Sequence, residues 1–254
     1  MDEIFELINL DMLKTVKEMI ANDTSLLYER DHNGNTPFIY SVFNKNWDIA
    51  EFLLFQKDND INAVNNKAET ALMYAARYGN LEFVQKLHKY GADLNKSSSY
   101  IGSVVFYAFE NIKKDILRYL VINGADVNGR NKYGASLLLK AVENNEIALI
   151  EWLVNNGADD IDAALRTAVL FDNLDAVKKL IDIGADINLL NKNGETLIVE
   201  AINNKNWDIV EYLFDNGADI INNTTTYGWE ILSSAAQAGK LELVKNIISA
   251  TNAF

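Results

Sequence analysis

Residues 69–95 read ETALMYAARYGNLEFVQKLHKYGADLN, and the chain on either side repeats this pattern with variations. The stretch holds two short apolar helical patterns, one from Leu72 to Ala76 and one from Leu81 to Leu87, with Gly79 between them. Each predicted helix is too short to be stable alone and carries an apolar stripe that needs a partner. Repetition of the stretch supplies that partner.

The tripeptide Gly-Ala-Asp near the end of this stretch occurs five times, and the intervals between copies are 33, 33, 27 and 33 residues. The copies begin at Gly91, Gly124, Gly157, Gly184 and Gly217. A period near 33 residues, with two helices in each repeat, predicts a stacked-repeat solenoid in which each repeat contacts its neighbours.

The pattern resembles the ankyrin repeat family, whose repeat opens on D-x-x-G-x-T-P-L and closes on G-A-D-x-N. Residues 31–38, DHNGNTPF, match the opening, and residues 194–197 with 217–219 match both ends of another copy. The resemblance implies an all-α fold (an α-solenoid) of paired antiparallel helices with β-turn fingers, forming a single domain over residues 1–254. We expect about eight repeats, at residues 1–30 (a degenerate N-terminal cap), 31–62, 63–95, 96–128, 129–161, 162–188 (shortened), 189–222 and 223–254 (a C-terminal cap).

Two features of the resembled repeat can be followed at its first helix. A hydroxyl side chain is expected to cap this helix in four repeats, as Thr36, Thr70, Ser136 and Thr196. The family has a histidine after T-P-L, which is absent here and is mostly replaced by apolar residues such as Met73 and Phe106. We therefore expect packing to replace the hydrogen bonds that the histidine implies.

The fourth and sixth repeats depart from the pattern at the finger. In the fourth, Gly102 comes one place late relative to Gly124, which predicts an irregular finger. In the sixth, the spacing is 27 rather than 33 residues, so the six residues that would form the finger are missing. We expect Asp162 to cap the helix that follows. The gap also predicts a weak joint between repeats one to five and repeats six to eight.

Charge and cysteine content restrict the classes of function. The chain has a formal net charge of −13 and no cysteine, which excludes disulfides and thiolate zinc sites. Nucleic acids and anionic membrane surfaces are disfavoured as partners, so the charge favours a protein partner with a basic or mixed surface. Many acids, including Asp48 and Glu82, are expected in the first turn of second helices, where they favour the helix dipole. Since no signal peptide or membrane-spanning apolar run is found, we expect a cytoplasmic protein. We also expect a monomer.

No catalytic residue, metal site or cofactor site is identified, and we expect none. The two histidines, His32 and His88, fall in different repeats, and no phosphate loop or dinucleotide glycine pattern occurs. The aspartates of the Gly-Ala-Asp turns occur once per repeat, about 10 Å apart at helix-packing distance, which is too far to share one ion. We interpret them as turn residues and the chain as a non-enzyme.

The resemblance implies that partners bind to the fingers and to the exposed face of the first helices. Aromatic residues recur there, and they are enriched at binding hot spots. We interpret the chain as a protein–protein interaction scaffold. The alternatives are a regulatory or inhibitory subunit or effector that blocks a partner's active site, and small-molecule or nucleotide sensing by stacking on Tyr78 or Tyr133. Tyr78, Tyr133 and Trp229 are the expected exposed anchors, and the candidate partner-binding residues are Phe43, Arg77, Tyr78, Tyr100, Lys132, Tyr133, Phe171, Tyr227 and Trp229.

Overall fold

The computed structural model describes residues 3–110, 114–219 and 224–251, and it leaves out the side chains of residues 224–230, 250 and 251. The chain divides into two compact units, unit 1 (Met1–Leu137) and unit 2 (Leu138–Phe254). The division falls inside the fifth predicted repeat and not at the shortened sixth repeat.

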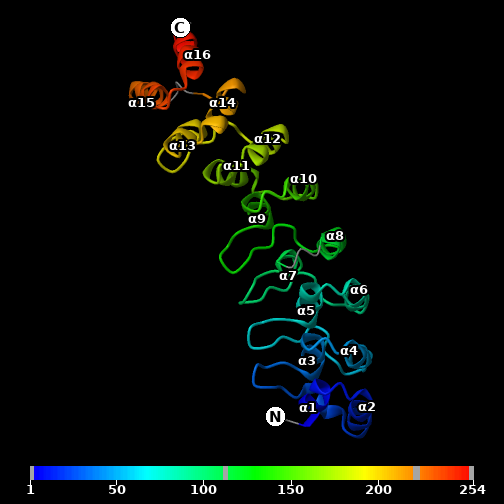
Figure 1. Ribbon diagram of the computed structural model, residues 1–254. Helices are drawn as coiled ribbons and strands as arrows, with labels where there is room; N and C mark the ends of the chain where they lie inside the picture. Colours follow the sequence, from blue (N-terminus) through cyan, green and yellow to red (C-terminus); the bar gives the residue numbers. More distant parts are fainter. Residues whose placement is uncertain (1–2, 111–113, 220–223, 252–254) are drawn as a thin grey trace. The chain divides into compact units, whose positions relative to one another are not determined.

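Unit 1 is built from pairs of short helices arranged in two rows (Figure 1). The inner helices pack against one another in chain order, and a 3-10 helix, η1 (Thr24–Tyr28), follows the first pair. The inner row holds α1 (Glu3–Asn9), α3 (Pro37–Phe43), α5 (Ala71–Tyr78) and α7 (Val104–Phe109). The outer row holds α2 (Leu13–Asn22), α4 (Trp47–Leu54), α6 (Leu81–Lys89) and α8 (Lys114–Ile122).

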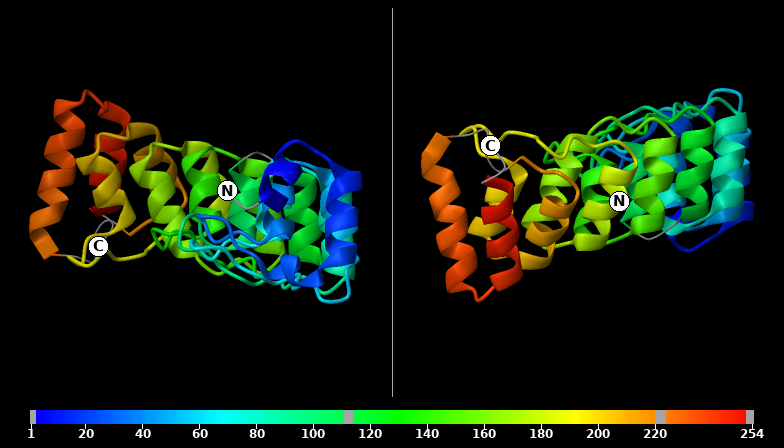
Figure 2. Two further views of the ribbon diagram at one scale, coloured as in Figure 1. Left: turned by 90° about the horizontal axis from the view of Figure 1, so that it is seen from below. Right: turned by 90° about the horizontal axis from the view of Figure 1, so that it is seen from above.

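Unit 2 continues the same alternation. Its first helix begins at Leu137, the last residue of unit 1, and its later inner helices pack on one another in chain order. Figure 2 shows α15 and α16, in orange and red, side by side as an antiparallel pair. The inner helices are α9 (Leu137–Glu143), α11 (Ile161–Leu170), α13 (Leu197–Asn203) and α15 (Thr224–Gln237). The outer helices are α10 (Ile147–Asn155), α12 (Leu174–Asp182), α14 (Trp207–Asp215) and α16 (Leu241–Thr251).

The two apolar stripes predicted in residues 69–95 are buried. Leu72, Ala75 and Ala76 on α5 are at most 1% exposed, and Val84 and Leu87 on α6 are fully buried. Helices of only eight and nine residues are therefore stabilised by apolar surface that neighbouring repeats remove from water. The predicted all-α repeat architecture is confirmed. The regular secondary structure of the described residues is helical, with isolated β-bridges within fingers and one, Gly102 with Asn131, between two fingers.

The predicted helix caps are confirmed at two positions and wrong at two others. Thr36 Oγ1 accepts a hydrogen bond from the amide of Ile39 at 3.2 Å, and Thr70 does the same for Met73 at 3.3 Å. Thr196 lies at the N-cap of α13 but makes no side-chain cap bond. Asp162 does not cap α11, because that helix already begins at Ile161. Its carboxylate accepts a hydrogen bond from the amide of Asp186 instead, at 3.3 Å.

Each finger is a short hairpin closed by a common set of bonds. In the third repeat the amide of Asn65 donates to the carbonyl of Glu69 at 3.1 Å, and Asn65 Oδ1 accepts from the amides of Lys67 and Glu69. The same bond, from the amide of one residue to the carbonyl four residues later, closes the fingers of the second, fifth and seventh repeats, at residues 31–35, 131–135 and 191–195. The finger conformation therefore follows from an Asp or Asn at its first position.

The fourth finger keeps the backbone closure, with the amide of Ser98 donating to the carbonyl of Gly102 at 2.9 Å, and the predicted irregularity is limited to its capping residue and its glycine. Ser98 takes the place of the Asn or Asp, and its Oγ accepts from the amides of Ile101 and Gly102. Gly102 has φ +118°, and a Cβ there would lie 2.3 Å from the carbonyl oxygen of Arg130. Only glycine fits this backbone conformation and this close approach of the next finger.

The aspartates of the Gly-Ala-Asp turns are turn residues, as interpreted. Asp93 Oδ1 accepts a hydrogen bond from the amide of Asn95 at 2.8 Å, which closes its own turn. The asparagine that ends the preceding repeat, Asn62, donates to the carbonyl of Gly91 at 3.0 Å and accepts from the amide of Asp93 at 2.8 Å. The terminal asparagine of one repeat thus fixes the turn of the next.

Candidate partner-binding surface

The tips of four consecutive fingers in unit 1 are joined by backbone hydrogen bonds. The amide of Asn66 donates to the carbonyl of Asn33 at 2.9 Å, that of Ser99 to Lys67 at 3.0 Å, and that of Lys132 to Ile101 at 3.0 Å. The fingers extend from the inner helices on the side away from the outer row (Figure 1). Each bond links one repeat to the next, so the tips form one edge whose geometry is set before any partner binds.

Lys67, Tyr100, Lys132 and Tyr133 form a finger-tip cluster on this edge. Lys67 Nζ lies 4.4 Å from the centre of the Tyr100 ring, and Lys132 Nζ lies 5.1 Å from the ring centres of both Tyr100 and Tyr133. These are cation–π distances. The Tyr100 side chain is 41% exposed and that of Tyr133 is 81% exposed. The cluster therefore combines positive charge with aromatic surface that a partner can reach.

Phe43, Lys45, Tyr74 and Tyr78 form an inner-helix cluster at the C-terminal ends of α3 and α5. The Tyr74 ring lies edge-on to Phe43 at 5.2 Å and is stacked with Tyr78 at 6.2 Å, while Lys45 Nζ lies 4.6 Å above the Tyr78 ring. Phe43 is exposed and Tyr78 is half-buried, and this burial raises the pKa of Tyr78. Arg77, half-buried, precedes Tyr78 at the end of α5.

The structure brings five of the nine candidate residues into these two clusters. Of the three expected anchors, Tyr133 is the most exposed, and Tyr78 is partly covered by Tyr74 and Lys45. The side chains of Tyr227 and Trp229 lie outside the described residues.

Phe171 belongs to unit 2, where it follows α11 and is 60% exposed. It lines a hollow of about 450 Å³ together with Glu143, Asp172 and Asp175. Carboxylates surround this aromatic ring, whereas lysines surround those of the finger-tip cluster. The two surfaces therefore differ in the charge that they offer to a partner.

A buried polar cluster beneath the fingers of unit 1 was not predicted. Glu69 is 2% exposed, and its carboxylate accepts hydrogen bonds from the hydroxyls of Tyr74 and Tyr107 and from the side-chain amide of Asn65. The Tyr107 hydroxyl also bonds to Ser98 Oγ at 2.7 Å. Burial raises the pKa of both tyrosines, and the neighbouring Glu69 carboxylate raises it further.

This cluster corrects the expectation that packing alone replaces the absent histidine. Tyr74 and Tyr107 come one residue after the histidine position. Tyr74 bonds to Glu69 within the third repeat, and Tyr107 bonds to the same carboxylate from the fourth repeat. The sequence carries a signal for this shift, because the same position holds a polar residue in other repeats too. These residues are Tyr40, Lys140, Thr167 and Glu200.

In unit 2, the seventh repeat has a related cluster that contains a cation. Asn191 Nδ2 donates to Glu195 Oε2 and to Glu200 Oε1, both at 2.7 Å. Arg166, which occupies the histidine position of the sixth repeat, bonds to Glu200 Oε1 at 2.6 Å. The Glu200 side chain is 12% exposed, so its charge is largely shielded from water and neutralised by the arginine.

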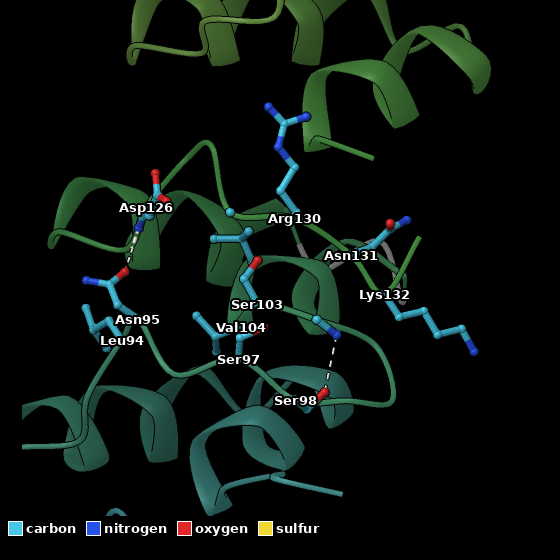
Figure 3. A pocket seen from close by; sticks show the side chains of 13 residues that line it. Leu94, Asn95, Ser97, Ser98, Ser103, Val104, Asp126, Arg130, Asn131 and Lys132 are labelled. Atoms are coloured by element: carbon cyan, nitrogen blue, oxygen red, sulfur yellow. Dashed lines mark hydrogen bonds between the residues drawn. The ribbon is translucent and has the colours of Figure 1, made fainter. Parts of the chain in front are cut away.

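A hollow of about 370 Å³ lies between the bases of the fourth and fifth fingers. Figure 3 shows the Arg130 and Lys132 side chains extending away from the wall formed by Ser98 and Ser103. The one carboxylate in the lining, Asp126, accepts a hydrogen bond from the amide of Asn128 and so closes the Gly-Ala-Asp turn. The lining therefore offers no paired acid and base for catalysis.

Metal binding and membrane crossing find no support in the described part of the chain. It holds no group of three or more acidic or histidine side chains arranged to hold a metal ion. His88 Nδ1 bonds to the Tyr119 hydroxyl at 2.9 Å, and His32 lies beside Asn33 at a finger tip. Over the same described residues, no helix combines the length and the apolar character needed to cross a membrane.

Sequence models of ankyrin repeats match most of the chain. One, described as "Ankyrin repeats (3 copies)", matches residues 6–98 and 165–253, and another, "Ankyrin repeats (many copies)", matches residues 105–154. The chain belongs to the ankyrin repeat family. Ankyrin repeats generally mediate protein–protein interaction and are typically non-enzymatic scaffolds.

Individual relatives of this ankyrin repeat chain are distant. Alpha-latrotoxin-Lg1a from Latrodectus geometricus is 36% identical over 86 residues, which are 33% of this chain and 6% of the toxin. The chain thus spans only a small part of that relative. The crystal structure of the ankyrin repeat domain of Bcl-3, described as a unique member of the IkappaB protein family, has a TM-score of 0.70 at 21% identity, covering 82% of this chain and 97% of that one. The human ASB11 ankyrin repeat domain has a TM-score of 0.62 at 19% identity, covering 78% and 90%. These structures show the shared fold.

Proposed function

We propose that this chain binds a protein partner through the finger surface of unit 1, defined as the finger-tip cluster together with the inner-helix cluster. The observation that carries the proposal is the pair of exposed rings, Tyr100 and Tyr133, on finger tips that are already hydrogen-bonded to one another. Aromatic residues supply much of the binding energy at protein interfaces, and a preformed surface loses little freedom on binding.

Sensing of a nucleotide or another small molecule has less support. The Tyr78 ring is stacked with Tyr74 and has Lys45 on its face, so little of it is left for a ligand ring. Tyr133 is 81% exposed, whereas small-molecule sites bury most of their ligand in a concave pocket. The finger surface suits a large partner, acting either as a scaffold or by covering the partner's own site.

The proposal is tested by photo-cross-linking. A photoreactive phenylalanine analogue in place of Tyr133 is expected to capture a protein from an extract of the native source. The same analogue in place of Tyr28, which is 59% exposed but lies on η1, is the control and is expected not to capture that protein.

The matched binding measurement uses the variant Tyr100→Ser/Tyr133→Ser, which removes two exposed rings and leaves the buried residues unchanged. We expect pull-down of the captured protein to fall at least tenfold, because hot-spot aromatics contribute about 1–2 kcal/mol each. Pull-down of that protein at full yield by the variant contradicts the proposal.

A further inference from the structure

Three lysines on or just before outer helices are each paired with a carboxylate of the preceding repeat. In unit 1, Lys86 Nζ on α6 lies 2.8 Å from a carboxylate oxygen of Glu51 on α4. Unit 2 repeats the arrangement with Lys179 and Glu151 at 3.3 Å, and Lys240 and Glu211 are 3.0 Å apart. These three ion pairs link consecutive repeats on the outer side.

Other lysines face aromatic rings: Lys17 and Lys178 do so on outer helices, at Phe52 and Tyr212, and the lysines of the finger surface do so as a group. Over the described residues, Lys45, Lys67 and Lys132 form no ion pair with a carboxylate, and their ammonium groups face tyrosine rings. The third to fifth fingers contain one carboxylate, Glu69, which is buried and bonded to tyrosine hydroxyls. A chain with a net charge of −13 thus presents an edge of positive charge at these tips.

The distance between the two lysine ammonium groups indicates which kind of partner segment can bind both. Lys67 and Lys132 contact the same Tyr100 ring, so their ammonium groups lie within about 10 Å of each other. Side chains at alternate positions of an extended peptide are roughly 7 Å apart and point to the same side. Acidic residues at alternate positions can therefore reach both lysines without breaking an existing ion pair.

We infer that the finger-tip cluster binds an extended acidic segment of the partner protein, an inference that rests on the proposed function. Two carboxylates of the segment contact Lys67 and Lys132, and an apolar side chain packs on the exposed Tyr133 ring. Whole-chain charge favours a basic or mixed partner surface, but the contact is made where the local charge has the opposite sign. Lysines beside exposed aromatic rings can also bind single-stranded nucleic acid, but the net charge of −13 disfavours a polyanion, so oligothymidylate is a competing probe in the test.

The first experiment measures fluorescence anisotropy with a labelled peptide of alternating Glu and Val residues. Peptides with Lys or Gln in place of Glu, oligothymidylate, and phosphatidylserine vesicles are the competing probes. We expect the acidic peptide alone to bind, and its affinity to fall as salt is added. Lys67→Gln/Lys132→Gln is expected to weaken binding about tenfold.

The matched control is Lys57→Gln/Lys89→Gln, which changes the net charge equally at two exposed lysines away from the fingers. We expect it to leave the affinity unchanged. Equal weakening by both double variants, no preference for the acidic peptide, or tighter binding of oligothymidylate or vesicles overturns the inference.

The cross-linking experiment separates this inference from the proposed function. An acidic partner segment attached at position 133 supports both. A neutral or basic segment attached there overturns the inference and leaves the proposed function standing. Failure to capture any protein at that position counts against the proposed function itself, whatever the peptide results are.

Discussion

The third repeat in unit 1 and the seventh repeat in unit 2 place polar side chains at the same three positions and use them differently. In both, an asparagine caps the finger and its side-chain amide donates to the other two positions. Asn65 also donates to Asn35 of the preceding finger. The positions are Asn65, Glu69 and Tyr74 in the third repeat, and Asn191, Glu195 and Glu200 in the seventh. The difference lies in the third position, which is a hydroxyl donor in one repeat and a carboxylate in the other.

That single difference decides how each cluster is neutralised. Tyr74 donates to Glu69, so the buried carboxylate of unit 1 is held by neutral donors. Glu200 only accepts, and Arg166 of the preceding repeat supplies the opposite charge. The first cluster is expected to respond to alkaline pH and the second to loss of its cation.

The two repeats also differ at the finger tip. The amide of Asn66 donates to the second finger, whereas the corresponding amide of Lys192 donates to no backbone carbonyl among the described residues. The cause is the sixth repeat, which lacks the residues of a finger. A deletion in one repeat thus leaves the next finger without a neighbour, while unit 1 keeps a joined edge.

The largest effect is expected from Glu69→Ala. The change leaves the hydroxyls of Tyr74 and Tyr107 and the Asn65 amide without their shared acceptor in a buried site, which costs about 3 kcal/mol of unfolding free energy. Glu195→Ala, at the same repeat position but half-buried, is expected to cost about 1 kcal/mol. Urea unfolding measures both, and equal losses would remove the distinction between the two repeats.

Arg166→Ala is expected to cost about 2 kcal/mol, because it leaves the Glu200 carboxylate shielded from water without a cation. Adding Glu200→Gln to this variant should recover about half of the loss, since the second charge is removed as well. The double-mutant cycle is measured by thermal or urea unfolding. A zero coupling energy between the two residues would show that the ion pair contributes nothing to unit 2.

Alkaline pH is expected to destabilise unit 1. The pKa of Tyr74 and of Tyr107 is raised in the folded state above the ordinary value of 10.0. The unfolded chain therefore loses these protons first, and stability that is complete below pH 10 is lost as pH rises above it. At pH 11 the loss should be about 1 kcal/mol for each tyrosine.

Tyr107→Phe is the control for the pH experiment. It is expected to lower stability at pH 8 by removing a hydrogen bond, and to reduce the further loss between pH 10 and pH 11 by about half. Hydrogen exchange of α5 and α7 amides reports on this region. An unchanged alkaline loss in the variant would assign it to other groups.

The smallest effect concerns the left-handed residue of each finger. Ala68 has φ +59° in the third finger, where the seventh has Gly194 with φ +80°. Ala68→Gly is expected to raise stability by about 0.5 kcal/mol, because glycine adopts the left-handed conformation without strain. Gly194→Ala is expected to lower stability by only about 1 kcal/mol, because the added Cβ strains the backbone but meets no neighbouring atom. Opposite signs in urea unfolding would confirm that alanine is strained at this position of both fingers, and a loss of stability in both variants would contradict it.

Most of the fold could be predicted from the sequence because it follows from a period. Apolar residues such as Leu72 and Leu87 recur at fixed positions, and the Asp93 turn is a local structure. The cluster around Glu69 was missed because its members come from two repeats and meet only when those repeats stack. The position of the tip residues could be predicted from the sequence, because Lys67, Tyr100 and Tyr133 follow one another at intervals of one repeat. The exposure of these side chains, and which ring each lysine faces, could be learned only from the three-dimensional structure.

The most direct test of a preformed binding edge is amide hydrogen exchange at the finger tips of the free protein. We predict that the amides of Asn66, Ser99 and Lys132, each bonded to the preceding finger, exchange at least tenfold more slowly than the amide of Lys192, after correction for intrinsic rates. Exchange of all four amides at the same fast rate would contradict the account, because the fingers of unit 1 would then move independently.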